Sequence, residues 1–285
     1  MSDLHTRRRF FAEEIEAVAN ISNKALVDAI ATVPREAFLG TGPWTVRSEI
    51  DMMGPARQTP DADPRWTYHN YAIAIDSSRQ LFNGAPALIA SAIDKLSLGA
   101  GSRVMHIGTA TGYYTALIAE MVGPSGCVVG IEVDETLAAA ARMNLATYPW
   151  IDVRHGDAAG ACDEPLDAML VNAGVTHPRD AWLDAVVSGG RLVLPLTASF
   201  PGSGPIGKGP QILLRKGDDG SFQASVIGFV AIFSAVGLRD DDLNAQLGAA
   251  LQRAPFPRLS RLRRDMHDSG AGCWFHGPTW CFSLN

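Results

Sequence analysis

One stretch, residues 102–132 (SRVMHIGTATGYYTALIAEMVGPSGCVVGIE), constrains the fold of this chain more than any other. An apolar run typical of a buried strand breaks at three small residues, Gly108, Ala110 and Gly112, before an apolar, helix-compatible segment and a second strand-like run that ends in Glu132. Small residues in such a turn let the backbone approach a ligand, and a carboxylate after the next strand accepts hydrogen bonds from ribose hydroxyls. Glu132 follows Gly108 by 24 residues, close to the spacing of about 20 in nucleotide-binding sheets. The stretch therefore predicts a strand–turn–helix–strand unit that binds a nucleoside.

Strand-like and helix-like segments alternate on both sides of this stretch. Helical periodicity extends over about residues 10–33 and recurs at 86–98 and 135–145, whereas short apolar strands are predicted at 151–154 and 168–171. This alternation predicts an α/β fold, a doubly wound and mostly parallel sheet with helices on both faces. After residue 211 a strand–turn–strand pattern predicts an antiparallel hairpin at one sheet edge.

The composition of the chain changes twice along its length, which predicts three regions. Residues 1–66 combine N-terminal helices with a loop rich in Pro, Gly and Asp over 40–66, which we interpret as lid-like. Residues 67–236 contain the predicted sheet, and residues 237–285 form a C-terminal extension.

The charge balance and the apolar runs bear on the partners that the chain can have. A net charge of −6 argues against nucleic acid, because nucleic-acid-binding domains are normally basic. One basic cluster, RLSRLRR at residues 258–264, is interpreted as the exposed face of a short helix rather than as a phosphate site. The longest apolar run is too short to span a bilayer and no signal peptide is visible, so we expect no membrane partner and a cytoplasmic location.

The C-terminal extension holds a group of potential metal ligands, His267, Cys273, His276 and Cys281. Their spacing matches no familiar zinc motif, so we expect no metal. The surrounding Trp and Phe residues instead predict that this segment packs onto the core, or onto a second subunit in a homodimer.

Several motifs occur in an order that resembles a known enzyme family. They are VPREAFLG at 33–40, RVMHIGTATGYYTALIAEMVG at 103–123, VVGIEVDETLAAAARMNL at 128–145, HGD at 155–157, DAMLVNAG at 167–174 and GGRLVLPL at 189–196. Together they resemble class I S-adenosylmethionine-dependent methyltransferases, specifically the protein-L-isoaspartate O-methyltransferase family. The resemblance covers roughly residues 10–235 and implies a Rossmann-like sheet.

The resemblance also implies a reaction. The cofactor would be S-adenosylmethionine, with S-adenosylhomocysteine as product, and the acceptor a carboxylate of a peptide or protein. The alternative is a methyltransferase of the same fold that modifies an oxygen, nitrogen or carbon of a small metabolite. A cofactor-binding relic that serves as an interaction module is the non-enzymatic alternative.

The resemblance further implies a set of cofactor-binding residues. The glycine turn would pass under the methionine part, Glu132 would hold the ribose hydroxyls, and Asp157 would reach the adenine amino group unless it only caps a turn. Asn172 would lie near the methyl donor, or else be a turn residue. The complete set is His106, Gly108, Thr109, Ala110, Gly112, Tyr113, Glu132, Val133, Gly156, Asp157 and Asn172.

Three positions depart from the family pattern. His106 replaces an acid, and a neutral imidazole cannot offset the ammonium charge of the cofactor as a carboxylate would. Ala110 replaces a glycine, so we expect a conventional φ there. Gly84 stands where the family has a serine, which places the repair of isoaspartyl residues in question.

The chemistry of the acceptor decides which side chains the loop before residue 86 must supply. A carboxylate needs no base, and Arg79 with the backbone N–H groups of Asn83 and Gly84 would hold it. A hydroxyl, amine or carbon acceptor needs a base, and Asp76 and His69 are the local candidates, although structural roles remain open for both. The residues predicted to contact the acceptor are Tyr71, Phe82, Asn83 and Gly84. Trp44, Trp66, Tyr71 and Phe82 would line an aromatic wall or anchor the long loop.

Overall fold

The computed structural model describes residues 4–48, 50–51, 54–160 and 164–284. The chain divides into two compact units, residues 1–102 with 109–155, and residues 103–108 with 156–285. The division runs through the predicted core of residues 67–236. In the described part of the chain no helix is long and apolar enough to cross a bilayer.

The first unit contains the helices α1 (Leu4–Ala19) and α2 (Lys24–Thr32) at its start and α3 (Pro86–Lys95) further along the chain. Asn23 is the N-cap of α2, since its side chain accepts a hydrogen bond from the Ala25 N–H at 3.0 Å. Asp94 of α3 accepts hydrogen bonds from the N–H groups of Ser22 (2.9 Å) and Asn23 (2.8 Å). This buried carboxylate therefore joins the start of α2 to α3.

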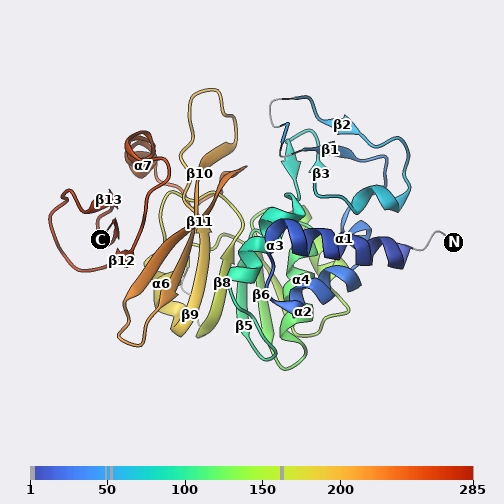
Figure 1. Ribbon diagram of the computed structural model, residues 1–285, viewed down its shortest axis with the longest axis horizontal. Helices are drawn as coiled ribbons and strands as arrows, with labels where there is room; N and C mark the ends of the chain where they lie inside the picture. The colour runs from blue at the N-terminus through green and yellow to red at the C-terminus, as the bar shows by residue number, and fades with distance from the viewer. Residues whose placement is uncertain (1–3, 49, 52–53, 161–163, 285) are drawn as a thin grey trace. The chain divides into compact units, whose positions relative to one another are not determined.

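A small antiparallel sheet with the order β2-β1-β3-β4 follows the first two helices (Figure 1). Its strands are β1 (Thr45–Arg47), β2 (Arg57–Gln58), β3 (Ala72–Asp76) and β4 (Leu81–Phe82). One 3-10 turn, η1 (Arg35–Phe38), precedes β1, and a second, η2 (Pro64–Thr67), lies between β2 and β3. Trp44 and Ile73 are buried in its hydrophobic cluster, and Trp66 and Tyr71 pack against that cluster. The predicted extended loop over residues 40–66 therefore contains regular structure, and these aromatic residues anchor it rather than form an open wall.

The rest of the first unit is the second half of the nucleoside-binding pattern. It contains α4 (Tyr113–Val122), β6 (Cys127–Glu132), α5 (Glu135–Asn144) and β7 (Ile151–His155). The strands β6 and β7 are parallel, with Glu132 opposite His155. The carboxyl ends of both strands therefore lie at the same edge.

The second unit is built on a sheet with the strand order β13-β14-β12-β11-β10-β9-β8-β5. Its first strands are β5 (Arg103–Ile107), β8 (Leu166–Val171) and β9 (Val186–Pro195), which pair in parallel, with helix α6 (Asp180–Ala185) between β8 and β9. The parallel strands alternating with helices confirm the predicted α/β class. Then β10 (Ile206–Lys216) and β11 (Phe222–Phe233) form the predicted antiparallel hairpin, longer at its start than expected.

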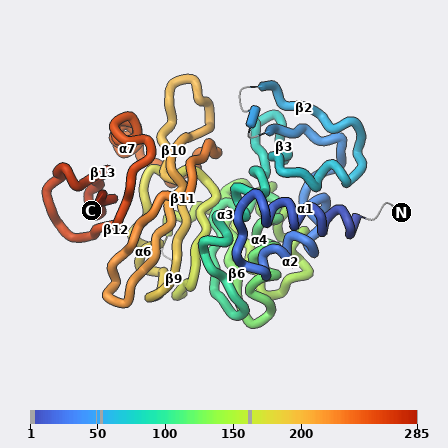
Figure 2. The backbone as a smooth tube through the Cα atoms, viewed as in Figure 1, coloured from blue at the N-terminus to red at the C-terminus, as the bar shows by residue number. Residues whose placement is uncertain are grey.

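The C-terminal extension adds three short strands to this hairpin. It contains α7 (Asp241–Arg253), β12 (Arg261–Arg263), β13 (Cys273–His276) and β14 (Cys281–Ser283). The predicted short helix at the basic cluster was wrong, because Arg261–Arg263 pairs as a strand with β11 and β14. Figure 2 traces the chain from α7 through these strands. Trp274, Phe275, Trp280 and Phe282 are all buried within the chain, so they do not offer the exposed apolar surface that a homodimer through them would need.

Candidate active site

The glycine turn begins where β5 meets the end of β8. Gly108 has φ of 82°, and a Cβ atom there would lie 3.2 Å from the carbonyl oxygen of Asn172. The N–H of Asn172 donates to the carbonyl of Ile107 at 2.8 Å. Only glycine combines this left-handed conformation with so close an approach of backbone to backbone. The structure thus places Asn172 directly beside the first glycine of the turn.

Ala110 has φ of 49°, in the left-handed region. The expectation of a conventional φ at this position was therefore wrong. The physical reason is a hydrogen bond, since the N–H of Ala110 donates to Oε2 of Glu132 at 2.7 Å. A charge-assisted bond of this kind offsets the cost of about 1–2 kcal/mol that a Cβ atom brings to the left-handed conformation.

Glu132 is buried, with 7% of its surface exposed, and it joins two segments of the first unit. Its Oε2 accepts from Ala110 and its Oε1 accepts from the N–H of Asp134 at 3.1 Å. Each carboxylate oxygen can accept a second hydrogen bond. The partners found for Glu132 are therefore backbone groups, and acceptor capacity remains for the predicted ribose hydroxyls.

The second glycine of the turn, Gly112, is the N-cap of α4 with φ of 101°. A Cβ atom there would lie 2.9 Å from Cδ1 of Leu145, so α4 begins in close contact with the segment after α5. Tyr113, the next residue, is buried and packs edge-on against Phe38 and Tyr114. Burial raises the pKa of Tyr113 to about 12. Its side chain therefore belongs to the core of the first unit, and only its backbone is available for the predicted cofactor contact.

Two further residues of the predicted cofactor-binding set, Thr109 and His106, are buried. Thr109 donates its N–H to the carbonyl of Ile131 at 3.3 Å, and its methyl group occupies the space where a Cβ of Gly130 would lie. His106 has no exposed surface, and burial lowers its pKa to about 3. The imidazole is therefore neutral at pH 7.

Three residues of the predicted cofactor-binding set lie after β6 and β7, among them Asp157, which the resemblance assigns to the adenine amino group. Val133 is exposed, and its carbonyl lies 3.1 Å from Nε2 of His155. Gly156 and Asp157 follow β7, and Oδ1 of Asp157 accepts from the N–H of Ala159 at 3.0 Å. Asp157 thus caps the turn through Oδ1 alone, and Oδ2 does not take part in that hydrogen bond. Contact with the adenine amino group stays a prediction.

A residue that sequence reasoning left without a role, Arg35, organises the predicted acceptor loop. Its guanidinium is completely buried. Nη1 donates to the carbonyls of Thr67 (2.8 Å) and His69 (3.1 Å). Nη2 donates to the carbonyl of Tyr71 (3.0 Å) and to Oδ1 of Asn83 (3.1 Å). Arg35 lies in the quoted motif VPREAFLG, but its acceptors are 32–48 residues away, so no local signal reveals them.

Most residues predicted to bind the acceptor make structural contacts within the first unit. Oδ1 of Asn83 also accepts from the N–H of Ile73 at 3.0 Å, and the carbonyl of Gly84 accepts from the Tyr114 hydroxyl at 3.2 Å. The Arg47 guanidinium lies over the Phe82 ring, 5.0 Å from its centroid. The hydroxyl of Tyr71 is directed to the carbonyl of Trp66. The loop is therefore held in one conformation by these contacts and by Arg35.

The predicted base Asp76 is occupied by hydrogen bonds. Its Oδ1 accepts from the Ser78 hydroxyl at 2.6 Å and its Oδ2 accepts from Nε of Arg79 at 2.6 Å. These bonds, first that from the Ser78 hydroxyl and then that from Arg79, lower the pKa of Asp76 to about 2. Arg79 also pairs with Asp134, the N-cap of α5. Asp76 is thus a weak base, and Arg79 is already paired with two carboxylates.

The other predicted base, His69, lies in a small aromatic group. Its ring stacks on Tyr71 with centroids 5.5 Å apart and lies 6.1 Å from the Trp66 ring. Burial lowers the pKa of His69 below its usual value. A lowered pKa makes the imidazole neutral at pH 7 but also a weaker base.

Comparison with known proteins decides whether these residues belong to a methyltransferase or to a non-enzymatic module. Residues 57–209, more than half of the 285-residue chain, match the family model for protein-L-isoaspartate(D-aspartate) O-methyltransferase. The chain belongs to this family. It is accordingly a methyltransferase, and S-adenosylmethionine is the cofactor that the family uses.

Relatives and solved structures of protein-L-isoaspartate O-methyltransferases agree with this assignment. The enzyme of Methanothrix thermoacetophila is 30% identical over 186 residues, which are 64% of this chain and 78% of that protein. Enzyme 1 of Archaeoglobus fulgidus is 29% identical over 198 residues, 68% of this chain and 81% of that protein. A solved protein-L-isoaspartate O-methyltransferase superposes with a TM-score of 0.62 at 20% identity, covering 88% of this chain and 73% of its own.

A second solved structure supports the predicted Rossmann-like fold. It is a Plasmodium falciparum protein described as a putative family member in complex with S-adenosyl-L-homocysteine. Its TM-score is 0.59 at 16% identity, and the superposition covers 80% of this chain and 97% of that one. The predicted doubly wound methyltransferase fold is thereby confirmed.

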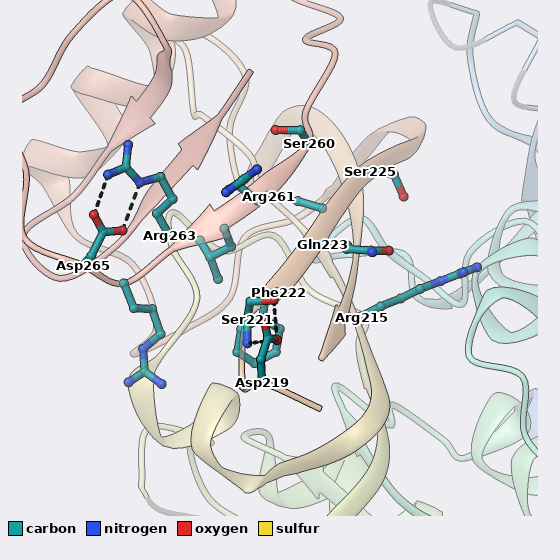
Figure 3. A pocket seen from close by; sticks show the side chains of 14 residues that line it. Arg215, Asp219, Ser221, Phe222, Gln223, Ser225, Ser260, Arg261, Arg263 and Asp265 are labelled. Atoms are coloured by element: carbon teal, nitrogen blue, oxygen red, sulfur yellow. Dashed lines mark hydrogen bonds and ion pairs between the residues drawn. The ribbon is translucent and has the colours of Figure 1, made fainter. Parts of the chain in front are cut away.

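The second unit of this family member also carries a polar groove (Figure 3). The groove has a volume of about 970 Å³ and is lined by the β10–β11 turn, β11 and β12, without any of the predicted site residues. Asp265 at its rim pairs with Arg263 at 2.9 Å, and Arg264 pairs with Asp180 and Asp184. These ion pairs account for several charges of the basic cluster, so we do not assign the groove to the cofactor.

Proposed function

We propose that this chain transfers a methyl group from S-adenosylmethionine to a carboxylate of an isoaspartyl residue in a peptide or protein. One observation carries the proposal, namely that the local candidates for a general base in the predicted acceptor loop are poor ones. Both carboxylate oxygens of Asp76 accept hydrogen bonds and its pKa is about 2, and the pKa of the His69 imidazole is lowered. A carboxylate is already anionic at pH 7 and needs no base.

Bound S-adenosylmethionine supplies the methyl group as an electrophilic sulfonium carbon. A carboxylate oxygen of the acceptor forms the new O–CH₃ bond while the S–CH₃ bond breaks, so a carboxylate and a sulfonium become a neutral ester and a neutral thioether. The protein contributes in-line positioning and removal of water rather than proton transfer.

We assign the cofactor-holding role to residues at the carboxyl ends of the parallel strands. In the first unit these are Ala110 and Glu132, and in the second unit Gly108, Asp157 and Asn172. The close backbone approach at Gly108 and the unused acceptor capacity of Glu132 fit a nucleoside ligand. The family relatives named for protein-L-isoaspartate support the choice of acceptor.

The test is a methylation assay with labelled S-adenosylmethionine and two peptides that differ only in one linkage. The first peptide contains an isoaspartyl residue and the second an ordinary aspartyl residue at the same position. We expect label in the first peptide alone, released by mild base because a methyl ester is base-labile. Absence of label from the isoaspartyl peptide, with S-adenosylhomocysteine still bound in calorimetry, would reject the acceptor while keeping the methyltransferase assignment.

The position of Gly84 defines a second arm of this test. The family has a serine there, so the Gly84→Ser variant restores the missing hydroxyl. Gly84 has φ of 77° and a Cβ there would lie 3.2 Å from Cγ1 of Ile89, so the variant is compared with Gly84→Ala, which carries the same strain without the hydroxyl. A higher kcat/KM of the serine variant over the alanine variant supports an isoaspartyl acceptor.

A further inference from the structure

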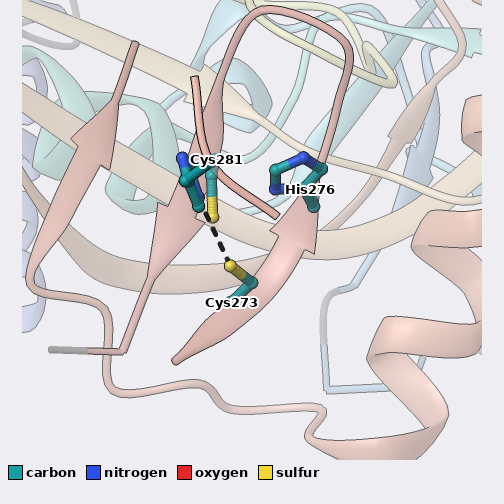
Figure 4. Close-up of side chains that lie close together, drawn as sticks. Cys273, His276 and Cys281 are labelled. Atoms are coloured by element: carbon teal, nitrogen blue, oxygen red, sulfur yellow. Dashed lines mark hydrogen bonds between the residues drawn. The ribbon is translucent and has the colours of Figure 1, made fainter. Parts of the chain in front are cut away.

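Four potential metal ligands of the second unit converge in the C-terminal extension. They are His267, Cys273, His276 and Cys281, and one ligand atom from each lies within 4.8 Å of all the others. Sγ of Cys273 is 3.5 Å from Nε2 of His267. Figure 4 shows Cys273, His276 and Cys281 close together on adjacent strands.

Strand pairing, rather than sequence spacing, brings these side chains together. In the antiparallel pair β13–β14, His276 is directly opposite Cys281. Cys273 lies at the start of β13, and His267 comes from the segment between β12 and β13. The two histidine rings are perpendicular, with centroids 4.8 Å apart. Four ligands from three segments therefore surround one point.

The histidines present suitable donor atoms to that point. Nδ1 of His267 lies 2.8 Å from the carbonyl oxygen of Asp265, which fixes the tautomer with the proton on Nδ1 and leaves the Nε2 lone pair toward Cys273. A hydrogen bond from the second ring nitrogen to a carbonyl is typical of metal-binding histidines. Nδ1 of His276 is buried and has no hydrogen-bond partner among the described residues. A buried imidazole nitrogen in this situation is an available ligand.

The dimensions and chemistry fit zinc. Zn–S bonds of about 2.3 Å and Zn–N bonds of about 2.0–2.1 Å place tetrahedral ligand atoms about 3.4–3.8 Å apart. The 3.5 Å between Cys273 and His267 is already at that value, and the largest separation of 4.8 Å needs only rotamer adjustments. Two thiolates and two neutral imidazoles give a closed Cys₂His₂ set without a position for substrate.

We propose that the C-terminal extension binds one Zn²⁺ through His267, Cys273, His276 and Cys281 as a structural site. Each cysteine thiol loses its proton when its Zn–S bond forms, so binding releases two protons and the site is electrically neutral. The ion ties β13, β14 and the segment after β12 together, in an extension too small to bury a large core of its own. This proposal replaces the expectation of no metal, which rested on the spacing alone.

The test measures zinc in the purified, reduced full-length protein by mass spectrometry of the metal. We expect about one zinc per chain in the unaltered protein. In Cys273→Ser and Cys281→Ser we expect the zinc content per chain to be lower by about tenfold or more. Cys127→Ser and His5→Gln are the matched controls, because Cys127 is a free thiol in β6 and His5 lies in α1, both in the first unit. The controls keep their zinc.

Cobalt substitution of the unaltered protein keeps the test decisive if the variants do not fold. Bound Co²⁺ gives the intense visible bands of a tetrahedral site and the charge-transfer band of a thiolate ligand. A chelator lowers Tm of the zinc-loaded protein and leaves Tm of the serine variants unchanged. The proposal is overturned if Co²⁺ gives no such bands, if the variants keep their zinc, or if the non-reduced protein contains a Cys273–Cys281 disulfide instead.

Discussion

At the scale of single residues, Ala110 is the position where local preference and function conflict. Its left-handed φ of 49° is one that glycine adopts freely and alanine adopts at a cost. In that conformation its N–H donates to Glu132 at 2.7 Å. The turn of this chain therefore has an alanine in a conformation that favours glycine.

Replacing Ala110 by glycine should stabilise the protein. Relief of the left-handed strain exceeds the entropy that glycine adds to the unfolded chain, so we expect a gain of about 0.5–1 kcal/mol in the free energy of unfolding. Urea denaturation measures it. Ala139→Gly, at an exposed position of the helix α5, serves as the control and should instead lose about 1 kcal/mol. A destabilised Ala110→Gly variant contradicts the strain argument.

Replacing Glu132 by glutamine should weaken cofactor binding. The amide keeps one acceptor oxygen but loses the charge and the second acceptor, so we expect affinity for S-adenosylhomocysteine to fall by about 1–3 kcal/mol. Calorimetry on folded protein measures this change. Glu135→Gln, at an exposed position of the first turn of α5, is the control and should bind normally. Equal affinity for both variants would show that Glu132 serves only the turn and the start of α5.

At the scale of elements, the guanidinium of Arg35 adds side-chain hydrogen bonds to the strand pairing that orders residues 67–83. Four acceptors between Thr67 and Asn83 converge on one buried side chain. Because three of these acceptors are backbone carbonyls, they have no sequence signature. Residues 67–83 are thus held together by a residue of η1, which precedes the whole small sheet in the chain.

Arg35→Lys should loosen this loop although it conserves the charge. A lysine ammonium cannot reach four acceptors, so buried carbonyls lose their partners and we expect a loss of about 3 kcal/mol in stability. Hydrogen exchange of residues 67–84 should accelerate as well. Arg65→Lys is the control, since its exposed pairs with Asp61 and Asp63 predict a change below about 0.5 kcal/mol. If the amides of residues 67–84 stay as protected in Arg35→Lys as in the unaltered protein, Arg35 does not hold this segment in place.

The same elements show how far sequence reasoning reaches. The unit from β5 to β6 was predicted because apolar periodicity and small residues are local signals. The left-handed Ala110 was not, because it depends on a carboxylate 22 residues away. The convergence of His267 with Cys273, His276 and Cys281 depends on the pairing of β13 with β14, which the ligand spacing does not encode.

At the scale of the whole molecule, the neutral buried His106 makes stability depend on pH. Burial lowers its pKa to about 3, from 6.5 for an ordinary histidine. Well above pH 6.5 His106 is unprotonated in both the folded and the unfolded state, so it does not change the free energy of unfolding with pH there. Below it only the unfolded state takes up the proton, and stability falls as the pH falls toward 3.

Between about pH 6.5 and about pH 5 we therefore expect His106 to remove about 2 kcal/mol from the free energy of unfolding. The His106→Asn variant does not titrate at this position, so its stability should fall less over the same interval. Denaturation series at several pH values measure both slopes. Identical slopes in the two proteins would contradict a neutral His106 in the folded state.

The order of strands in the C-terminal extension has a consequence for local unfolding. β14 pairs with β12 on one side and with β13 on the other, although both precede it in the chain. The three strands are therefore not all paired until β14 has folded between β12 and β13, and both pairings are lost when β14 detaches. We expect the amides of all three strands to exchange as one cooperative unit, with a single opening rate that the last strand controls.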